Sequence, residues 1–401
     1  MTRGTPELRL PCFLLLGLTA ACWPYDPATN SIPELSLLGL VGPCIAQESG
    51  FAGGTGQSSD PYQICNATML QAMADGLALH YQVSSSFDAG ETAAWNSGAG
   101  FVPVGTAGSP FTGSLSGQSL TISGLYINPG SSDCGLFGYL SGSSVSNLTL
   151  TNVTVSGTSG CGTLAGSATG ATLSNITVVN PAVTGTGILG GVVGDAANTT
   201  LTRIFVSGGS VTGSSNELGG IVGRLRTGTA VVSQSYGNTT VNYTGTGGIN
   251  FGIIAGLLGN GGGGNGIMQD CYAAGTVNAP NASAKVGGLL GHSWLSAGIY
   301  RSYSVAQVIS SGTLVAGGVG ALQGSSFNDS YCLDVYDIDV DTNECWEQNG
   351  GGGATGTARR TAAQLRCPTF AGENCSGATT YGAWSSSVWN FGDSGTLPVP
   401  L

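Results

Sequence analysis

A short glycine-bounded turn recurs along the middle of the chain and restricts its possible folds more than any other feature. Successive closing glycines are separated by 28, 28, 29, 36, 32 and 29 residues. Seven copies at nearly constant spacing predict a stack of repeated structural units. The copies are Gly135-Leu136-Phe137-Gly138, Gly162-Thr163-Leu164-Ala165-Gly166, Gly190-Gly191-Val192-Val193-Gly194, Gly219-Gly220-Ile221-Val222-Gly223, Ala255-Gly256-Leu257-Leu258-Gly259, Gly287-Gly288-Leu289-Leu290-Gly291 and Ala316-Gly317-Gly318-Val319-Gly320.

Each unit continues after the turn with short segments that alternate apolar and polar residues, as β-strands do. Residues 145–150, 173–178 and 201–206 place Leu, Val or Ile between Ser, Thr or Asn, and a third short strand such as 153–155 follows. One such coil buries little apolar surface alone, but stacked coils share a continuous core. The pattern predicts an all-β parallel β-helix, or β-solenoid, of about seven coils. Glycine is needed where φ is positive and where one coil's backbone lies against the next.

Composition narrows the class of protein further. The chain has 401 residues with 70 Gly and 41% hydrophobic residues, but only 8% are charged, against about 25% in an average soluble domain. Glycine without a G-X-Y period excludes collagen, and the apolar content argues against disorder. A net charge of -11 argues against nucleic acid and anionic membranes as partners. We expect the polar, sparsely charged surface of a secreted protein.

Residues 1–46 predict an export segment. Two arginines precede the apolar run Cys12–Cys22, and a second apolar run covers Leu35–Ala46. A basic start followed by an apolar stretch is typical of a secretory signal, with cleavage here after Ala21 or after Ala46. No later stretch reaches 18 uninterrupted apolar residues, so no membrane span is expected in the mature chain.

The remaining chain is expected to form one elongated domain in three parts. Residues 47–133 form an N-terminal cap and the first coils, 134–330 the repeat coils, and 331–401 a C-terminal cap. Within the N-terminal part, residues 66–78 are the best helix candidate, with Asn66 or Thr68 as N-cap. A second short helix is expected near 361–366. Capping segments shield the open edges of the terminal coils.

Eleven cysteines in an exported chain predict disulfide bonds. Cys44 and Cys65 would pair if Cys44 is retained, whereas Cys271 occupies a strand position and is expected to be a buried free thiol. The chain has no Cys-x-x-Cys or His-x-x-x-His spacing and only two histidines, so no zinc site and no cofactor are expected. The other candidate pairs are Cys332 with Cys345, Cys367 with Cys375, and Cys134 with Cys161.

These motifs together resemble those of proteins with the GLUG repeat, over roughly residues 51–401. Residues 51–56, followed by Asp60-Pro61-Tyr62, are similar to the start of that family, and residues 389–399 are similar to its tail. Ser116 is a departure, because related chains usually carry Asp before the glycine. The resemblance implies a right-handed β-helix found in secreted and cell-surface proteins, including large adhesins and the non-catalytic part of some immunoglobulin A peptidases. It supplies no catalytic site.

The coils carry few residues suited to acid–base chemistry. Glycoside hydrolysis needs two carboxylates facing each other across a bond, so we expect no catalytic residue and no enzyme activity. Asp195 and His292 share a phase after a closing glycine but lie several coils apart, with Arg224 and Asn260 between them. His292 is expected in a turn and His80 in the N-terminal cap. From Cys134 to Gly320 the acids are Asp195, Glu217 and Asp270, and the bases are Arg203, Arg224, Arg226, Lys285 and Arg301.

The densest acidic cluster follows the repeats, between Cys332 and Cys345. Carboxylates at alternating positions there are a weak candidate for Ca²⁺, which prefers oxygen ligands. The spacing is not that of an EF-hand, so a solvated acidic hairpin is the favoured interpretation and no metal is assigned. The candidate ligands are Asp334, Asp337, Asp339 and Asp341.

The sequence therefore predicts an extracellular structural or adhesion protein. Its long solenoid surface and protruding loops would contact a glycan or a cell-surface or matrix protein. One alternative is a carbohydrate-active β-helix enzyme or glycan-binding protein, and another is a self-assembling fibre subunit. Ten Asn-x-Ser/Thr sites are acceptors for glycosylation only in a glycosylating source.

Overall fold

The computed structural model divides the chain into two units, Met1–Ile45 and Ala46–Leu401, and the second contains the repeats. The structure describes residues 44–214, 216–226, 228–247, 250–259, 266–280, 285–311, 314–333, 345–348, 353–355, 358–360, 365, 384–391 and 397–401.

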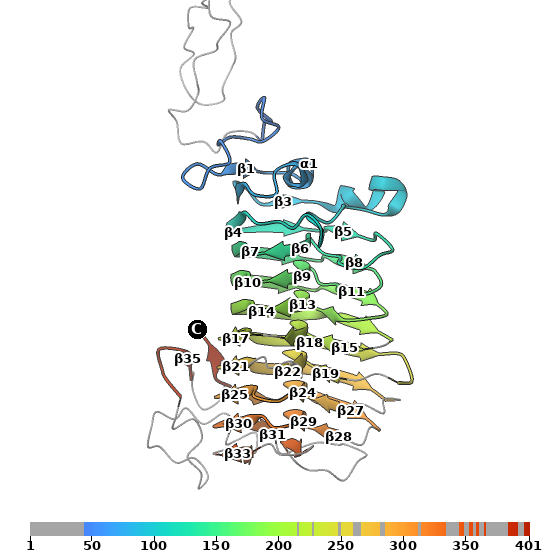
Figure 1. Ribbon diagram of the computed structural model, residues 1–401, viewed down its shortest axis with the longest axis vertical. Helices are drawn as coiled ribbons and strands as arrows, with labels where there is room; N and C mark the ends of the chain where they lie inside the picture. Colours follow the sequence, from blue (N-terminus) through green and yellow to red (C-terminus); the bar gives the residue numbers. More distant parts are fainter. Residues whose placement is uncertain are drawn as a thin grey trace, which may run out of the picture. The chain divides into compact units, whose positions relative to one another are not determined.

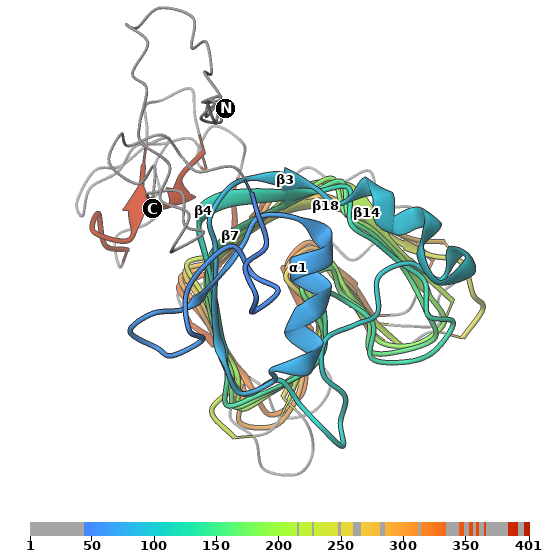
Figure 2. The same ribbon diagram turned by 90° about the horizontal axis from the view of Figure 1, so that it is seen from above.

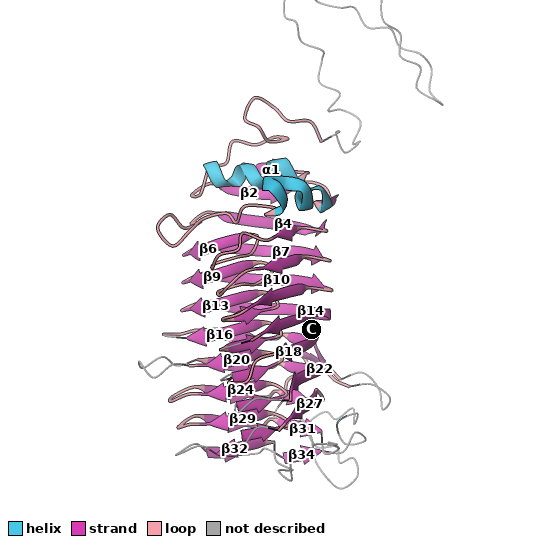
Figure 3. Ribbon diagram, turned by 90° about the vertical axis from the view of Figure 1, so that its right-hand side faces the viewer, coloured by secondary structure: helices cyan, strands magenta, loops and turns pink. Residues whose placement is uncertain are grey.

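The repeats form a right-handed parallel β-helix of about seven coils, whose strands lie in regular layers one above another (Figures 1 and 3). The coils build three parallel sheets, and the coils between Leu189 and Ala316 contribute to all three. The eight-stranded sheet contains β6 (Phe137–Ser141), β9 (Ala165–Thr169), β13 (Val193–Ala197), β16 (Val222–Arg226), β20 (Ala255–Leu258), β24 (Leu290–Ser293), β29 (Val319–Leu322) and β32 (Trp346–Gln348). The five-stranded sheet contains β12 (Leu189–Gly190), β15 (Glu217–Gly219), β19 (Asn250–Gly252), β23 (Lys285–Gly287) and β28 (Leu314–Ala316).

The large sheet supplies the remaining wall of each coil. Its long strands bend, so that one strand or two short ones cover the same path in successive coils. Its members are β1 (Tyr62–Ile64), β2 (His80–Val83), β3 (Phe87–Asp88), β4 (Ser114–Ser123), β5 (Tyr126–Ile127), β7 (Ser144–Thr151), β8 (Thr154–Ser156), β10 (Thr172–Val179), β11 (Ala182–Gly185), β14 (Thr200–Gly213), β17 (Val231–Ser233), β18 (Tyr236–Tyr243), β21 (Ile267–Gln269), β22 (Tyr272–Ala279), β25 (Gly298–Tyr300), β26 (Tyr303–Ser304), β27 (Gln307–Ser310), β30 (Ser326–Asn328), β31 (Tyr331–Leu333), β33 (Gly353–Thr355) and β34 (Ala358–Arg360).

The core is a set of apolar columns that run along the stack. Leu148, Ile176 and Ile204 are register partners on β7, β10 and β14, and all three are buried. Side chains alternate between the two faces of a strand, so the intervening Thr and Ser residues lie outward. Because every coil repeats this order, each apolar side chain contacts its equivalents in the coils before and after it.

The recurring glycines sit where strands of the five-stranded sheet turn back into the eight-stranded sheet. A Cβ atom on Gly190 would lie 1.9 Å from the Val193 carbonyl oxygen, and one on Gly191 would lie 2.0 Å from that of Gly220 in the next coil. Such contacts exclude any side chain. Neither glycine has a positive φ, so close packing, rather than a left-handed backbone, requires glycine here.

Strand register corrects the position of one repeat. Ala255 pairs with Leu290 and Leu257 with His292, so Gly256, and not Gly259, is equivalent to Gly291. The closing glycines of this region are therefore separated by 33 and 35 residues instead of 36 and 32. Gly259, with φ +80, belongs to the loop that follows the strand.

A bend in the large sheet carries a second column of related residues. Asn147 and Asn175 occupy it in successive coils, each with φ 54, a conformation that Asn tolerates better than most residues. The Asn175 side chain donates to Asn147 Oδ1 at 2.8 Å, and Arg203 Nε of the next coil donates to Asn175 Oδ1 at 2.5 Å. In later coils the same bend holds Asp270 and Arg301.

The N-terminal end of the stack is crossed by a short helix, α1 (Ala67–Ala72) (Figure 2). Asn66 is its N-cap and accepts a hydrogen bond from the Met69 amide at 2.8 Å. The helix is shorter than the predicted 66–78, because a 3₁₀ turn, η2 (Met73–Asp75), ends it before Gly76. A further 3₁₀ segment, η3 (Gly90–Gly98), lies beside the first coils.

Strand pairing continues beyond residue 330, where the sequence predicted a cap. Strands β32, β33 and β34 add to β29, β30 and β31. Farther along, β35 (Trp389–Asn390) and β36 (Val399–Pro400) form an antiparallel pair. Trp384, Trp389 and Phe391 pack against a column of tyrosines on the large sheet. Apart from Leu365, the predicted helix near 361–366 lies outside the described residues.

Candidate functional site

Most acidic, basic and histidine side chains of the coils gather in one strip, which we call the polar strip. It lies along the eight- and five-stranded sheets on either side of the glycine turn. Between Cys134 and Gly320 the sequence has eight charged residues and one histidine, and six of these nine belong to it. The polar strip comprises Asp195, Glu217, Arg224, Arg226, Lys285 and His292, together with Asn250.

Strand register builds the polar strip from two columns. On the eight-stranded sheet, Asp195 pairs with Arg224, Arg224 with Leu257, and Leu257 with His292. Leu257 occupies the place that the sequence assigned to Asn260. On the five-stranded sheet, Glu217 pairs with Asn250 and Asn250 with Lys285. The columns face each other because each turn reverses the chain between them.

Asp195 anchors one end of the polar strip through two arginines of the next coil. Arg224 Nη2 lies 2.7 Å from Asp195 Oδ2, and Arg226 Nε lies 2.9 Å from Asp195 Oδ1. The carboxylate side chain is 11% exposed and the arginines 25% and 34%. Burial alone would raise the pKa of Asp195, but hydrogen bonds from both arginines outweigh it and lower the pKa below the usual value.

Glu217 has the opposite electrostatic environment although it lies in the same strip. Burial raises its pKa, while the positive charge of Arg224 and the side chain of Asn250 only partly oppose that effect. One carboxyl group is thus held ionised while its neighbour is shifted toward the protonated form. Such a divided pair is the arrangement used for acid and base roles in many enzymes. Both oxygens of Asp195, however, are already engaged by arginine.

The other end of the polar strip holds Lys285 and His292, with Nζ 3.4 Å from Nδ1. Among the described residues, Lys285 has no carboxylate partner. Burial lowers the pKa of Lys285, and burial together with the nearby Lys285 lowers the pKa of His292 to about 4. His292 is 1% exposed and lies within β24. The prediction of a turn position for it was wrong, because the strand extends beyond the closing glycine.

Three polar atoms in this end are buried without a hydrogen bond of standard geometry in the described parts of the chain, although Gln323 lies close to His292 and Glu217 lies close to Asn250. They are His292 Nε2, Trp294 Nε1 and Asn250 Oδ1. The rings of His292 and Trp294 touch edge to face, with centroids 4.9 Å apart. A buried polar atom without a partner costs about 1–3 kcal/mol.

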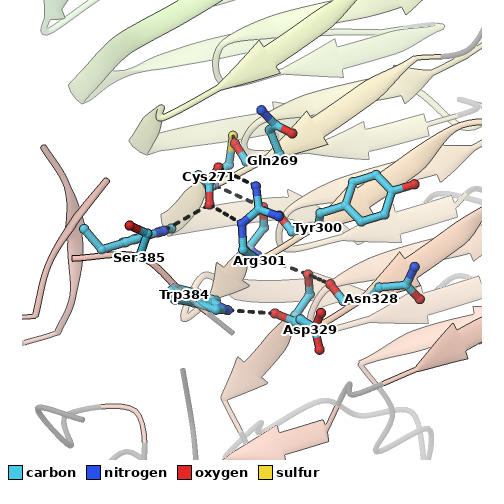
Figure 4. A network of polar contacts seen from close by, with 12 residues as sticks. Gln269, Cys271, Tyr300, Arg301, Asn328, Asp329, Trp384 and Ser385 are labelled. Carbon is cyan, nitrogen blue, oxygen red and sulfur yellow. Dashed lines mark hydrogen bonds and ion pairs between the residues drawn. The ribbon is translucent and has the colours of Figure 1, made fainter. Parts of the chain in front are cut away.

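A second ionic cluster lies on the large sheet and is closed by the C-terminal segment (Figure 4). Arg301 donates twice to Asp270, with both distances 2.8 Å. Trp389 Nε1 donates to the same carboxylate at 3.2 Å, and Trp384 Nε1 donates to the Asp329 carbonyl oxygen at 3.0 Å. We call this arrangement the tryptophan clasp. Its polar groups are mutually satisfied, so it offers no binding group.

The cysteines serve the stack rather than the polar strip. Cys134 is bonded to Cys161 in the adjacent coil, and Cys332 is bonded to Cys345. Cys44 and Cys65 each take part in a disulfide bond as well. The predicted partners Cys367 and Cys375 lie outside the described residues.

Cys271 is a buried free thiol, as the sequence predicted. Burial raises its pKa, which disfavours the reactive thiolate. His80 lies in β2, where its Nδ1 is 2.8 Å from Ser114 Oγ.

The sequence placed a weak Ca²⁺ candidate in the acidic cluster that follows the repeats. Asp334, Asp337, Asp339 and Asp341 lie outside the described residues. Within the described ranges, no three His, Cys, Asp or Glu side chains are grouped to hold a metal ion. The helices in those ranges include none long and apolar enough to span a membrane.

Sequence reasoning named the charged residues of the polar strip but did not bring them together. The signal was a fixed offset on each side of the turn. Asp195, Arg224 and His292 follow a closing glycine directly, whereas Glu217, Asn250 and Lys285 precede one by six positions. Two constant offsets around a reversing turn place two columns opposite each other. Because Gly259, and not Gly256, was taken as the closing glycine of that repeat, the six-residue offset of Asn250 was not apparent in the sequence.

The fold and the polar strip define the class: a parallel β-helix protein with a charged strip along its coils. No protein-family profile matches the chain, so the resemblance to GLUG-repeat proteins is not confirmed. Halomucin of Haloquadratum walsbyi is 40% identical over 114 residues. That match covers 25% of this chain and only 1% of halomucin.

Two solved structures share the fold. One is a crystal structure of a proposed immunoglobulin A1 protease from Bacteroides ovatus, with 21% identity and a TM-score of 0.54. It is matched over 87% of this chain and 95% of that chain. The other is an IgA1 protease with 19% identity and a TM-score of 0.53, matched over 72% of this chain and 23% of that one.

These neighbours correct the prediction that the chain has no enzyme activity. Both are described as proteases, so proteins with this fold are not confined to structural roles. The scarcity of acids and bases along the coils was the basis of that prediction. Scarcity along the whole stack did not preclude their concentration in one strip.

Proposed function

We propose that the chain is an extracellular or cell-surface contact module that binds glycan or glycoprotein partners through the polar strip. One observation carries the proposal: six of the nine acidic, basic and histidine side chains of the coils lie together in that strip. The rest of the coil surface consists mainly of Ser, Thr, Asn and Gly. Directional recognition requires charged or hydrogen-bonding groups at fixed positions.

Two further observations agree with an extracellular role. Disulfides join Cys134 to Cys161 and Cys332 to Cys345, and such bonds persist in oxidising compartments. The partial similarity to halomucin, whose name is that of a mucin, points to the same setting. A rigid stack of coils holds its outward side chains at fixed spacing, which suits contact with a repetitive surface.

The test is a binding assay of the purified chain on a glycan array and on whole cells. The strip variant is Arg226→Gln combined with Lys285→Gln, and the matched control is Arg203→Gln, which removes one exposed base from the large sheet. We expect the strip variant to lose at least about tenfold in affinity, equivalent to about 1.4 kcal/mol, and the control to bind as the parent does. Equal binding by both variants, or no binding by the parent, would overturn the proposal.

A second candidate function is glycan hydrolysis, favoured by the divided pKa values of Asp195 and Glu217. In it, Glu217 would act as the acid. Occupation of both Asp195 oxygens by Arg224 and Arg226 disfavours that role for Asp195 and makes binding the leading proposal. Release of reducing ends from a polysaccharide panel, abolished by Glu217→Gln, would reverse this order. Cleavage of immunoglobulin A1 is assayed in parallel because of the neighbours' described activity.

A further inference from the structure

The end of the polar strip that holds Asp195 includes an arginine with donors to spare. Arg224 binds the Asp195 carboxylate with two nitrogens, Nε at 3.2 Å and Nη2 at 2.7 Å. Arg226 reaches the same carboxylate through Nε alone, 2.9 Å from Oδ1 and 3.0 Å from Oδ2. The N–H groups on the two terminal nitrogens of Arg226 therefore have no partner among the described residues. Since 34% of this side chain is exposed, these donors face solvent and need no cavity to be reached.

Asp195 fixes the position of the Arg226 guanidinium without cancelling the local positive charge. Two arginines and one ionised carboxylate leave one net positive charge in this cluster, whereas the formal net charge of the chain is -11. Glu217, the other acid of the polar strip, acts on Arg224. The pKa of Arg226 is raised by its hydrogen bonds to Asp195, against the effect of burial, and in smaller part by Tyr139. A guanidinium that is held in place with free terminal nitrogens is preorganised to bind two oxygens of an anion.

Small and hydroxyl-bearing side chains lie between Arg226 and the first coils. Arg226 pairs with Ala197 of the preceding coil, and Ala197 pairs with Thr169 of the coil before that. Tyr139 lies on β6, one coil farther, and its hydroxyl is 3.0 Å from Thr169 Oγ1. The long side chains of Tyr139 and Arg226 thus converge over two coils whose outward residues here are small. Because a hydroxyl both donates and accepts, the Tyr139–Thr169 pair keeps a donor and acceptor lone pairs for a ligand.

We propose that Arg226 and Tyr139 bind an anionic sugar residue of a glycan, with Arg226 holding its carboxylate or sulfate group. This inference rests on the proposed function, because it names the class of glycan recognised at one end of the polar strip. The terminal nitrogens of Arg226 donate to two oxygens of the anion, which both groups provide. The hydroxyls of Tyr139 and Thr169 bond to ring hydroxyls, which an acidic peptide such as polyglutamate lacks.

The test is isothermal titration of the full chain with three ligands. They are an oligogalacturonate, the same oligosaccharide after reduction of its carboxyl groups, and a sulfated galactan oligosaccharide. We expect an acidic ligand to bind at least about tenfold more tightly than the reduced form, as a charge-assisted pair requires. Preference for the oligogalacturonate or for the sulfated galactan then identifies a carboxylate or a sulfate as the source of the anion.

Variants of Arg226 separate a positioned donor from a positive charge alone. Arg226→Gln should weaken binding of the acidic ligand at least about tenfold. Arg226→Lys keeps the charge, but its ammonium is occupied by Asp195 and has no fork of terminal nitrogens, so it should lose nearly as much. Tyr139→Phe, which removes only the hydroxyl, should lose about fivefold. Arg203→Gln, which removes an exposed base of the large sheet, should bind as the parent does. Circular dichroism melting shows whether each variant is folded.

Three results would overturn the inference. They are binding of both acidic ligands no tighter than that of the reduced form, unchanged binding by folded variants of Arg226 or Tyr139, and equally tight binding of a polyglutamate peptide. If array binding depends on the polar strip but is confined to neutral glycans, the proposed function stands and this inference alone fails. Binding of an acidic oligosaccharide that requires Arg226, without any array or cell binding, would remove the proposed function and leave the anion site.

Discussion

Two ionic clusters bridge neighbouring coils of this β-helix, and they are completed in different ways. In the polar strip, Asp195 pairs with Arg224 of the next coil, and in the tryptophan clasp, Asp270 pairs with Arg301 of the next coil. The geometry of the two pairs is similar. The clasp then receives a third donor from the chain itself, Trp389 Nε1. The polar strip instead continues into Trp294 Nε1, which is buried without a hydrogen-bond partner among the described residues.

The difference separates a cluster whose hydrogen bonds lie within the fold from one that the proposed function assigns to a partner. A satisfied, covered ion pair has no spare capacity, and its loss is felt as lost stability. Buried donors without a hydrogen bond of standard geometry, beside a half-buried ammonium, cost stability. The same cross-coil pairing therefore supports closure on one wall of the stack, while on the other wall it lies within the strip to which we assign the proposed binding function.

The largest expected effect comes from removing the indole that closes the clasp. Trp389 is 1% exposed and packs against Tyr303 and Trp384, with centroids 5.9 and 4.4 Å away. Trp389→Ala should lower the free energy of unfolding by about 3–5 kcal/mol and release the C-terminal segment to proteases. Trp389→Phe, which keeps a ring but loses the bond to Asp270, should cost about 2 kcal/mol. Urea unfolding and limited proteolysis measure both, and a Trp389→Ala variant as stable as the parent would contradict the clasp.

The next effect is a pH dependence that belongs to the polar strip. The pKa of His292 falls from about 6.5 in the unfolded chain to about 4 in the fold because of burial and Lys285. The stability associated with neutral His292 is fully present above about pH 6.5 and is lost as the pH falls toward 4. The loss in free energy of unfolding is on the order of 3 kcal/mol. His292→Gln should remove this slope and Trp389→Ala should retain it. A parent chain with the same unfolding free energy at pH 7 and pH 4.5 would contradict the burial of a neutral imidazole.

Much of the fold could be predicted from the sequence because its determinants are local and repeated. The closing glycines recur at a near-constant interval, and the apolar alternation around Leu148 and Ile176 specifies which face is inside. The shortened helix after Asn66 and the strand that carries His292 were harder to predict from the sequence. Both depend on how far a strand or helix continues, which is decided by packing against the adjacent coil.

The polar strip was only partly predictable for a different reason. Asp195 and His292 share a phase in the sequence, but Glu217 and Lys285 join them only because the turn folds a second column back against the first. The clasp could not be predicted at all. Trp389 is 119 residues from Asp270, outside the repeat, so no periodicity connects them.

A smaller effect should follow from neutralising the carboxylate that anchors the strip. Asp195→Asn loses its charge-assisted bonds to Arg224 and Arg226, at a cost of about 2 kcal/mol. Because the folded pKa of Asp195 is depressed, its stabilisation is present above the unfolded pKa of about 3.9 and is lost as the pH falls through the lower folded value. The variant should lack that loss below about pH 4. Asp270→Asn removes a more buried carboxylate, so it should lower the free energy of unfolding by more than Asp195→Asn does. The reverse order would contradict the proposed difference between the two clusters.

The smallest effect should come from Glu217, and its sign is opposite. Burial raises the folded pKa of Glu217, so the protonated form is favoured in the fold. Stability from this group is present below the unfolded pKa of about 4.3 and is lost as the pH rises through the folded value. Glu217→Gln should therefore match the parent near pH 4 and exceed it by about 0.5–1 kcal/mol at pH 7. Denaturant unfolding at the two pH values measures this, and a variant less stable than the parent at pH 7 would show that ionised Glu217 is stabilised by Arg224.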